Sequence, residues 1–324
     1  MGVYLEIFSK YLKSGKIFSI FLIGVWYFLC KKNEIGNNLR YNLAIFDLKK
    51  INEFYSIKTN EVLLQIDLKD KGISQDLFLY GNREPYSTEF FKNDIQNNDN
   101  IVDIGANIGY YAILESIIAE NGKIYAIEPI PKSMQILRKN SELNKRINIE
   151  FFTMGIGRED GELSINIYDK SNYASFTNNP HTKVISTHKV QMMRLDKFLS
   201  TFVKTSPTYI RMDVEGFETE IIGGMQNLLE SFQPFKLFIE IHPFLITHED
   251  LIAMIDTLKN NGFKIRAIFN EPAARDLHSL KNISKIHKKL DIPTFGFVGN
   301  DYKDLEHAVN QWPYKAYNVF FERK

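Results

Sequence analysis

The stretch VDIGANIGYY, residues 102–111, decides the fold of this chain. It joins an apolar run that ends at Asp103 to the apolar pattern of a helix that begins near Tyr110. Between them, Gly105 permits a tight turn, and Gly109 lets the helix pack closely on the strand, so that backbone amides at the helix start face a ligand. The sequence therefore predicts a strand, a ligand-binding loop and a helix in succession.

Short apolar runs that are typical of buried parallel strands recur on both sides of this loop. They alternate with helical stretches such as 133–144 and 218–229. Strands that alternate with helices indicate a doubly wound α/β fold, with a mostly parallel sheet and helices on both of its faces. The runs expected to form strands are residues 101–104, 123–127, 147–152, 209–212 and 236–241, followed by 263–269, 294–298 and 317–321.

The sequence before this domain predicts a preface that begins with strands. Alternating apolar residues within 61–80, on either side of residues 69–72, are typical of a hairpin of two half-buried strands. A short helical stretch follows at 90–96, and an Asn-rich turn at 97–100 precedes the main domain. We expect an N-terminal helical segment over 1–40, the hairpin and helical preface over 41–98, the main domain over 99–270 and an extension that completes the sheet over 271–324.

The first residues combine an amphipathic helical pattern with an almost wholly apolar run at 17–30. A helix over this run reaches roughly 21 Å at ~1.5 Å per residue, less than the ~30 Å of a membrane's hydrocarbon core, so a membrane span is not expected. A signal peptide is poorly supported, because no small-residue cleavage site follows Cys30. A myristoylation motif after Gly2 is not matched either, because Glu6 stands where it requires Ser or Thr. Two alternatives stay open: these helices pack against the domain, or residues 1–32 make peripheral contact with the inner face of a membrane.

The composition excludes several classes of protein. Hydrophobic residues make up 44% and charged residues 24% of the chain, as in ordinary globular proteins. The 40 basic residues balance the 39 acidic ones, so no overall positive field draws the chain to nucleic acid, and we expect no nucleic-acid partner. Cys30 is the single cysteine, which excludes an internal disulfide or a Cys-rich zinc site and agrees with a cytoplasmic location.

The charges beside the loop favour S-adenosylmethionine over a dinucleotide. Asn107 stands where a dinucleotide-binding loop has its second glycine, and the carboxylate of Asp103 repels phosphate but suits a ligand with ammonium and sulfonium groups. Glu128 ends the next strand, 25 positions after Asp103 (128 minus 103), which is the spacing of one βα unit. Its carboxylate can accept hydrogen bonds from two ribose hydroxyls, and Pro129 stops the strand there. The alternative for Glu128 is a solvated acidic residue at a strand end.

Five sequence blocks, in this order, resemble a methyltransferase domain of the FkbM type over residues 101–269. They are VDIGANIGYY, IYAIEP, GIGREDGEL, YIRMDVEGFE and FIEIHP. The resemblance implies a Rossmann-like class I methyltransferase fold and an S-adenosylmethionine-dependent O-methyltransferase that acts on hydroxyl or carboxyl oxygens of polyketides, sugars or related metabolites. The residues then expected to bind the cofactor are Asp103, Gly105, Ala106, Asn107, Gly109, Tyr110, Glu128, Pro129, Gly157, Glu159 and Asp160.

One residue of the third block departs from the family pattern. Arg158 stands where the family often has an acidic residue after the third strand of the domain. The adenine amino group then lacks its usual acceptor, and Glu159 or Asp160 next to it can accept in its place.

Four side chains at the ends of two later strands are expected to form the reacting end of the site. Asp213 and Glu215 follow the strand at 209–212, while Glu240 and His242 share one face of the strand at 236–241, because alternate residues do so. Ligands of doubly wound sheets bind at this edge. We expect His242 to act as the base that removes a proton from an alcohol acceptor, with the carboxylates orienting it or raising its pKa.

Other interpretations of these four side chains stay open. His242 can instead cap the turn before Pro243, and an acceptor that is itself a carboxylate needs no base. Adjacent carboxylates and a histidine also suit Mg²⁺ or another divalent cation, although we assign no metal.

The remaining sequence leaves the acceptor unnamed. The polar and aromatic stretch 171–182 is expected to form part of the acceptor pocket, or else a surface loop. We expect the acceptor to be a small molecule, sugar, lipid-linked glycan or secondary metabolite. Two other classes of function compete: a nicotinamide-dependent oxidoreductase, which Asn107 and the block IRMDVEGFE argue against, and a scaffold that keeps the fold without catalysis.

Overall fold

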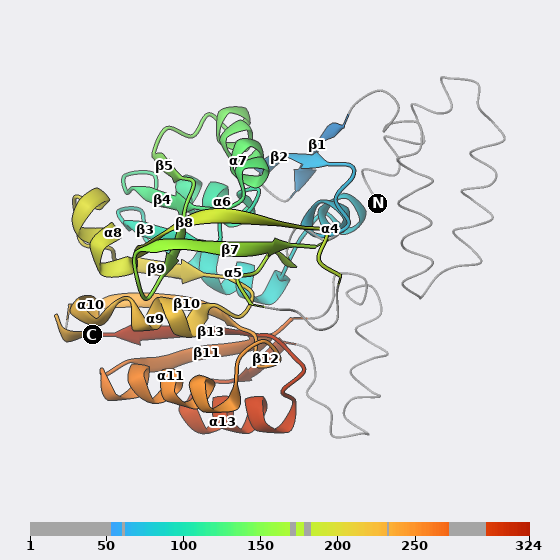
Figure 1. Ribbon diagram of the computed structural model, residues 1–324. Coiled ribbons are helices and arrows are strands. Elements are labelled where there is room, and N and C mark those ends of the chain that lie inside the picture. The colour runs from blue at the N-terminus through green and yellow to red at the C-terminus, as the bar shows by residue number, and fades with distance from the viewer. Residues whose placement is uncertain (1–52, 60–61, 169–172, 178–182, 232, 272–295) are drawn as a thin grey trace, which may run out of the picture.

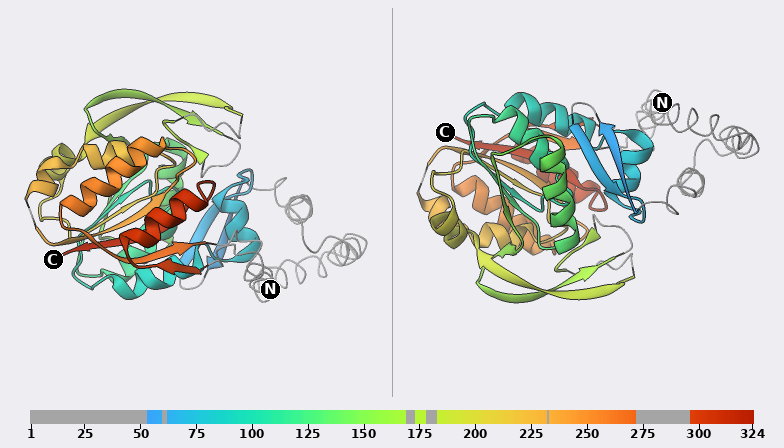
Figure 2. Two further views of the ribbon diagram at one scale, coloured as in Figure 1. Left: turned by 90° about the horizontal axis from the view of Figure 1, so that it is seen from below. Right: turned by 90° about the horizontal axis from the view of Figure 1, so that it is seen from above.

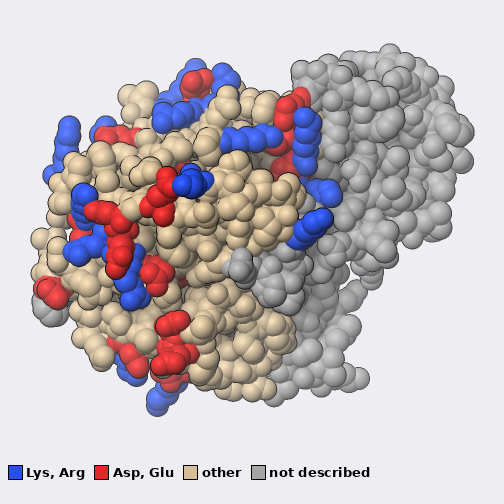
Figure 3. Space-filling view, viewed as in Figure 1, with Lys and Arg blue, Asp and Glu red and all other residues tan. Residues whose placement is uncertain are grey.

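The computed structural model describes residues 53–59, 62–168, 173–177, 183–231, 233–271 and 296–324 (Figure 1). The helices expected within 1–40 lie outside these ranges. Within the ranges, none of the helices combines the length and the apolar character needed to cross a membrane. On the face seen in Figure 3, acidic and basic side chains are interspersed, in keeping with the balanced charge of the sequence.

The main sheet has eight strands in the spatial order β12-β11-β13-β10-β9-β3-β4-β5. The eight strands expected between residues 101 and 321 are present, with small differences at their ends. All neighbours from β10 to β5 are parallel, whereas β13 runs antiparallel between β10 and β11. The strands are β3 (Ile101–Ile104), β4 (Ile124–Ile127), β5 (Ile149–Phe152), β9 (Tyr209–Met212), β10 (Phe235–Ile241), β11 (Lys264–Asn270), β12 (Gly296–Gly299) and β13 (Tyr317–Arg323).

Helices cover both faces of this sheet, as Figure 2 shows. The strands are buried on both sides: Val102 packs into one hydrophobic core and Ile101 into the other. The first face is covered by α5 (Pro85–Asp94), α6 (Tyr110–Ile118) and α7 (Pro131–Leu143). The second is covered by α8 (Leu195–Phe202), α9 (Glu218–Gly223), α10 (Gln226–Glu230), α11 (His248–Asn260) and α13 (Tyr302–Gln311). The doubly wound α/β fold predicted from the sequence is confirmed.

The strand order reverses between β3 and β9. From β3 the chain goes to β4 and β5 at one edge, and it later returns to β9, the other neighbour of β3, before it continues to β10. Ligands of open α/β sheets bind outside the carboxyl ends of the strands at such a reversal. Asp103 lies opposite Arg211 in the register of these two strands. The glycine loop after β3 and the acidic segment after β9 therefore meet at one place.

The preface differs from the predicted hairpin in its second half. Strand β1 (Phe54–Thr59) pairs antiparallel with β2 (Val62–Asp67), and the prediction of a strand at residues 77–79 was wrong, because helix α4 (Ile73–Tyr80) stands there. The carboxylate of Asp70 accepts from two backbone amides at the start of α4 and so nucleates a helix. Two alternating leucines are too short a pattern to distinguish a strand from a helix.

The single helix predicted over 218–229 was also wrong in detail. The segment forms two short helices, α9 and α10, which are separated near Gly224. A Cβ at Gly224 would lie 2.0 Å from the carbonyl oxygen of Gly157, so the backbone passes too close to its neighbour for a side chain. This neighbour belongs to a small separate sheet, ordered β6-β8-β7, of strands β6 (Gly155–Gly157), β7 (Gly161–Ile167) and β8 (Ser186–Arg194).

Candidate active site

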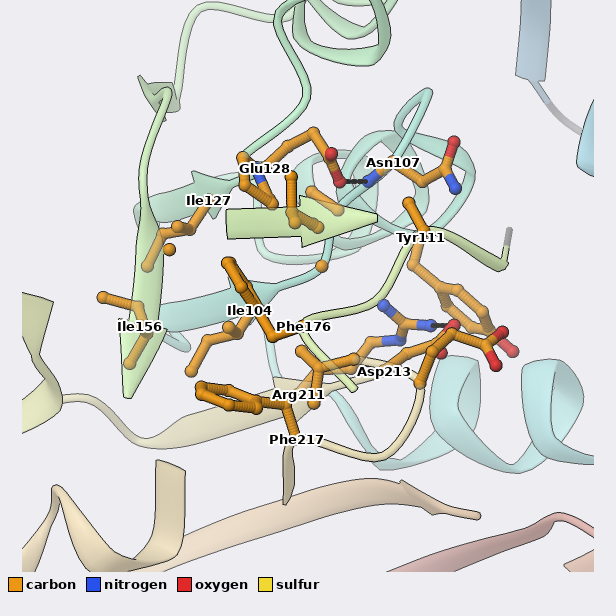
Figure 4. A pocket seen from close by; sticks show the side chains of 18 of the residues that line it. Ile104, Asn107, Tyr111, Ile127, Glu128, Ile156, Phe176, Arg211, Asp213 and Phe217 are labelled. Carbon is orange, nitrogen blue, oxygen red and sulfur yellow. Dashed lines mark hydrogen bonds and ion pairs between the residues drawn. The ribbon is translucent and has the colours of Figure 1, made fainter. Parts of the chain in front are cut away.

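A pocket lies beyond the carboxyl ends of β3, β4 and β9 (Figure 4). Its empty space, open mouth included, is about 790 Å³. Figure 4 shows Glu128 and Asn107 at one end and Arg211 and Asp213 at the other. The apolar residues of the wall are Ile73, Ile104, Ala106, Ile127, Met154, Ile156, Ile165, Ala174, Phe176, Val214 and Phe217.

The glycine loop is shaped by close backbone contacts. Gly105 has a φ of +83°, and a Cβ there would lie 2.0 Å from the backbone oxygen of Asp213. Gly109 has a φ of +89°, and its Cβ would meet the side chain of Leu137 on α7 at 2.8 Å. The first glycine thus allows β3 and the end of β9 to approach each other, and the second allows α6 to pack on α7.

The backbone amides of this loop are already used inside the protein, contrary to the expectation that they face a ligand. Those of Gly105 and Ala106 donate to the carbonyl of Ile127 at 2.9 and 3.0 Å. That of Asn107 donates to Glu128, and the amides of residues 108 and 109 donate to Asn107 and Ala106. Because these donors are spent, the loop offers no cradle of amides to a phosphate.

Glu128 lies in the pocket wall and is held by two backbone donors. Its Oε2 accepts from the amide of Asn107 at 2.9 Å, and its Oε1 accepts from the amide of Ile130 at 2.8 Å. Each carboxylate oxygen keeps a second lone pair, so Glu128 can still accept hydrogen bonds from two hydroxyls of a ligand. Burial raises the pKa of Glu128 to about 7, although the two amide donors oppose this shift.

Asp103 is buried beneath the pocket rather than in its wall. Its side chain has no exposed surface, and its Oδ1 accepts from Nη1 of Arg211 at 2.9 Å. The same guanidinium donates through Nη2 to Asp213 at 3.2 Å, and its face lies 3.9 Å from the ring centroid of Tyr111. Asp103 therefore binds a cation, as its charge suggested, but that cation is an arginine of the neighbouring strand.

A buried row of alternating charges extends from this pair to the preface. Beyond Asp213 the row continues to Arg83, whose Nη2 lies 3.8 Å from Oδ2 of Asp213, and then to Glu84, which accepts from Nε of Arg83. Glu84 also accepts from the hydroxyl of Tyr111 at 2.8 Å. Burial opposes the charge of Arg83, but the carboxylates of Glu84 and Asp213 outweigh it and raise the pKa of the guanidinium. Both arginines line the pocket.

His242 lies behind the pocket, among three carboxylates. Its Nδ1 contacts Oε1 of Glu218 at 2.8 Å, and its Nε2 lies 3.5 Å from Oε2 of Glu215 and 3.7 Å from Oε1 of Glu240. Burial alone would lower the pKa of His242, but these carboxylates raise it well above its ordinary value. The three carboxylates thus favour the protonated ring, in which Nδ1–H donates to Glu218.

Glu215 lines the pocket directly in front of this histidine. It is a non-glycine residue with a φ of +50°, a strained conformation that persists only where the surroundings impose it. Its backbone carbonyl accepts from the hydroxyl of Ser175 at 2.6 Å, which helps to hold it. Burial raises the pKa of Glu215 to about 7, with His242 opposing the shift and Asp213 adding to it. Asn107, which also lines the pocket, and Glu84, which is next to the lining residue Arg83, have positive φ as well.

Two overlapping groups in this cluster have the geometry to hold a metal ion. Asp213, Glu215 and His242 form one group, and Glu84, Asp213 and Glu240 form the other, with ligand atoms within 4.8 Å of one another. The charge row and the imidazolium already compensate much of this acidity, and we assign no metal.

The sequence-predicted residues divide between the pocket wall and positions behind or away from it. Six residues predicted to bind the cofactor and two predicted to be catalytic line the pocket: Gly105, Ala106, Asn107, Tyr110, Glu128, Pro129, Asp213 and Glu215. Asp103, Gly109, Gly157, Glu240 and His242 are not in the wall. Nor are Glu159 and Asp160, the residues proposed to contact adenine. Asp160 instead accepts from Lys197 at 2.6 Å and from the amide of Arg194 at 2.9 Å.

The sequence reasoning missed four charged residues of the site, one of which is Glu218, the contact of His242. Arg211 carries a detectable signal, because an arginine in the middle of the buried run YIRMD must have an acidic partner. Arg83 and Glu84 carry only a weak one, since they stand before the proline that begins α5 and more than a hundred residues from Asp213 in the chain. Arg158, the departure from the family pattern, pairs with Glu220 at 3.3 Å and does not line the pocket.

Comparison with known families and proteins gives one consistent result. The model of the methyltransferase FkbM domain matches residues 103–265, about half of the chain. "Methyltransferase 1" of Beauveria bassiana is 29% identical over 145 residues, which cover 39% of this chain and 58% of that protein. The "Hexuronic acid methyltransferase AglP" of Haloferax volcanii is 27% identical over 152 residues, which cover 46% of this chain and 58% of that protein. The chain thus spans less than two thirds of the length of these relatives.

Among solved structures, a methyltransferase FkbM from Methylobacillus flagellatus is similar. It aligns with 74% of this chain and 52% of its own, at 16% identity and a TM-score of 0.38.

Proposed function

The chain belongs to the methyltransferase FkbM domain family, and from this premise we propose that it uses S-adenosylmethionine to methylate an oxygen of a small-molecule, glycan or lipid acceptor. The observation that carries the proposal is that Glu128 and the pair Asp213 and Glu215 face one pocket, from the two sides of the strand reversal. One side offers acceptors for ribose hydroxyls, and the other places carboxylates where a reacting group is expected.

The residues of the pocket fit the proposed cofactor. Glu128 has lone pairs left for two hydroxyls, and the apolar wall that includes Ile156, Phe176 and Phe217 suits a purine ring. The acidic lining suits a ligand that carries ammonium and sulfonium groups. When bound, S-adenosylmethionine supplies an electrophilic methyl group with its own leaving group. A dinucleotide fits less well, because the loop amides are spent and cannot hold its pyrophosphate.

We propose that Glu215, rather than His242, takes the proton of a hydroxyl acceptor. An imidazolium has no free lone pair, and His242 is not in the pocket wall, whereas Glu215 is. A base is most effective when its pKa is near the working pH, and Glu215 has a pKa of about 7. His242, held by Glu218, then keeps the carboxylate of Glu215 in position. An acceptor carboxylate would need no base, and its methylation would not depend on the charge of Glu215.

A sugar derivative is the acceptor class that the relatives favour. AglP is described as a hexuronic acid methyltransferase, and a hexuronic acid carries both hydroxyls and a carboxylate. AglP is 27% identical to this chain over less than half of its length, so the sugar acceptor is proposed here and is tested by a direct assay. Incubation with labelled S-adenosylmethionine and a panel of uronic acids, neutral sugars and lipid-linked glycans tests it.

Binding measurements separate the methyltransferase from the oxidoreductase and the scaffold. We expect S-adenosylhomocysteine, but not NAD, to bind the full chain in calorimetry, and Glu128→Gln to weaken this binding while the exposed Glu142→Gln does not. Asp103→Ala is a poor test, because it would leave Arg211 as an uncompensated buried charge and destabilise the fold. Binding of NAD would favour the oxidoreductase, and binding of neither would favour the scaffold.

A further inference from the structure

Arg83 places hydrogen-bond donors in the pocket that nothing in the described part of the protein uses. Its Nε donates to Glu84, whereas its Nη2 is 3.8 Å from the nearest carboxylate oxygen of Asp213, too far for a hydrogen bond. Within the described residues, neither Nη atom donates a hydrogen bond. As far as the described residues go, the end of the guanidinium that presents two parallel donors has no hydrogen-bond partner, and this is the arrangement that binds a carboxylate through both oxygens.

The position of Arg83 is fixed before any ligand arrives. Its backbone carbonyl accepts from the hydroxyl of Thr88 at 3.0 Å and from that of Tyr110 at 3.4 Å. Its partner Glu84 is held in a left-handed conformation with a φ of +46° and is tied to Tyr111. Because the side chain is already ordered, little conformational entropy is lost when it binds a ligand.

The other candidates for binding an anion in this pocket are spent or have the wrong charge. Arg211 donates through both Nη atoms to Asp103 and Asp213, and its face covers Tyr111. Its Nε has no partner in the described residues, but it is fully buried and out of reach of a ligand in the pocket. The amides of the glycine loop donate within the protein. The remaining charged residues of the described wall, Glu128 and Glu215 among them, are acidic and repel an anion.

We propose that Arg83 is the carboxylate-binding residue of this pocket. This inference rests on the proposed methyltransferase function and deepens it. The carboxylate has two possible sources: the amino-acid part of S-adenosylmethionine, or an acidic sugar acceptor such as a hexuronic acid. Both ligands carry a carboxylate that the acidic wall cannot accommodate without a cation.

The first experiment tests the cofactor as the source. Affinities of S-adenosylhomocysteine and of its decarboxylated analogue are measured by calorimetry for the wild type, Arg83→Gln and Arg83→Lys, with the exposed Arg138→Gln as a control. If Arg83 binds the cofactor, the wild type prefers the carboxylated ligand by about 10- to 100-fold. Arg83→Gln then removes the preference, Arg83→Lys keeps part of it, and Arg138→Gln keeps all of it.

The second experiment tests the acceptor as the source. The same variants, saturated with S-adenosylhomocysteine, are titrated with D-glucuronate and D-glucose. If Arg83 binds the acceptor, Arg83→Gln loses the preference for glucuronate while its affinity for S-adenosylhomocysteine stays within about threefold of the wild type. Thermal unfolding shows whether each variant is folded.

The outcomes distinguish this inference from the function on which it rests. If the wild type binds S-adenosylhomocysteine and folded Arg83→Gln changes neither preference, the role of Arg83 is wrong and the proposed function stands. If the wild type does not bind S-adenosylhomocysteine, the proposed function fails, and this inference fails with it.

Discussion

The two halves of the pocket are built in different ways. The half at the ends of β3 and β4 is defined by backbone contacts. Gly105 lies so close to the backbone oxygen of Asp213 that a Cβ would clash with it, and Glu128 is held by two main-chain amides. The half at the ends of β9 and β10 is defined by charges, in which Arg211 compensates Asp213 and His242 compensates Glu215. The first half is therefore sensitive to added volume, and the second to a change of charge.

The largest effect is expected in the half defined by charges. Glu215→Gln keeps the shape of the side chain but cannot accept a proton, so we expect kcat with a hydroxyl acceptor to fall by about 10²- to 10⁴-fold. The affinity for S-adenosylhomocysteine should stay within about threefold, because the proposed ribose contact lies in the other half. In the wild type, activity should rise as the pH increases through about 7, where Glu215 loses its proton.

Two measurements check this prediction. Steady-state kinetics gives kcat across the pH range, and Glu220→Gln, at a partly exposed residue outside the pocket wall, is the control. Unchanged turnover of Glu215→Gln on a hydroxyl acceptor would rule out Glu215 as the base. Loss of cofactor binding in this variant would show that the two halves are not separable in the way proposed.

A comparable loss, but of structure, is expected in the half defined by the backbone. Gly105→Ala adds a Cβ 2.0 Å from a backbone oxygen at a φ of +83°, and we expect it to lower the free energy of unfolding by about 2–5 kcal/mol and to abolish cofactor binding. Gly81→Ala is the matched control, because Gly81 has a φ of +75° but nothing within 4 Å of the added atom. It should cost only about 1–2 kcal/mol, the cost of the strained backbone.

Denaturant unfolding and calorimetry of the two glycine variants test this difference. Equal losses of stability would mean that backbone strain, and not the close approach of the strands, determines the role of Gly105.

A smaller effect is expected from Glu128. Its carboxylate form accepts from hydroxyls, so binding of S-adenosylhomocysteine should weaken as the pH falls below about 7, where the carboxyl group gains a proton. Glu128→Gln should bind about 10- to 100-fold more weakly than the wild type at pH 8 and lose this pH dependence. Calorimetry at pH 6 and pH 8 checks both, and the same pH dependence in Glu128→Gln would assign it to another group.

The smallest effect concerns Glu115, beneath the charge row. Neither of its carboxylate oxygens has a hydrogen-bond partner within the described part of the chain, and burial, with Asp103 adding to it, raises its pKa well above the ordinary value. The folded state therefore binds a proton that the unfolded chain releases, so this contribution to stability is present at acidic pH and is lost as the pH rises. Glu115→Met should stabilise the protein by about 1–3 kcal/mol at pH 8 and flatten this dependence.

Urea unfolding at pH 5.5 and pH 8 measures both effects of Glu115→Met. A loss of stability at both values would show that the carboxylate has a structural role with Arg211, which lowers its pKa in the folded state.

More of the fold than of the site could be predicted from the sequence. Strands follow from local patterns along the chain, whereas the site depends on contacts between residues that are far apart in the sequence. Strands such as β3 and β9 are short apolar runs whose pattern is local, so the sequence shows them directly. The helix α4 was missed because the capping carboxylate of Asp70, and not the apolar pattern, determines it. The N-terminal helices, and the two alternatives of packing on the domain or contacting a membrane through residues 1–32, stay predictions, since these residues lie outside the described ranges.

The site was predictable where its parts are neighbours in the chain. The loop at Gly105 and the acidic end of β4 follow a spacing of one βα unit, and both reach the pocket wall. Asp103 looked like a ligand contact because its partner Arg211 is 108 positions away and becomes adjacent only in the sheet. The pairing of Arg83 with Asp213 is equally remote, and so a cation of the pocket escaped notice.

The position of β13 in the middle of the sheet bears on how the protein is made. Strands β10 and β11 do not pair with each other but with the two sides of β13, residues Tyr317–Arg323. While the chain is being synthesised, β10 and β11 therefore each have one unpaired edge until β13 has been translated. Such edges invite wrong pairing, so we expect nascent chains that stall before residue 317 to depend on chaperones, although their pocket-forming strands have already been synthesised.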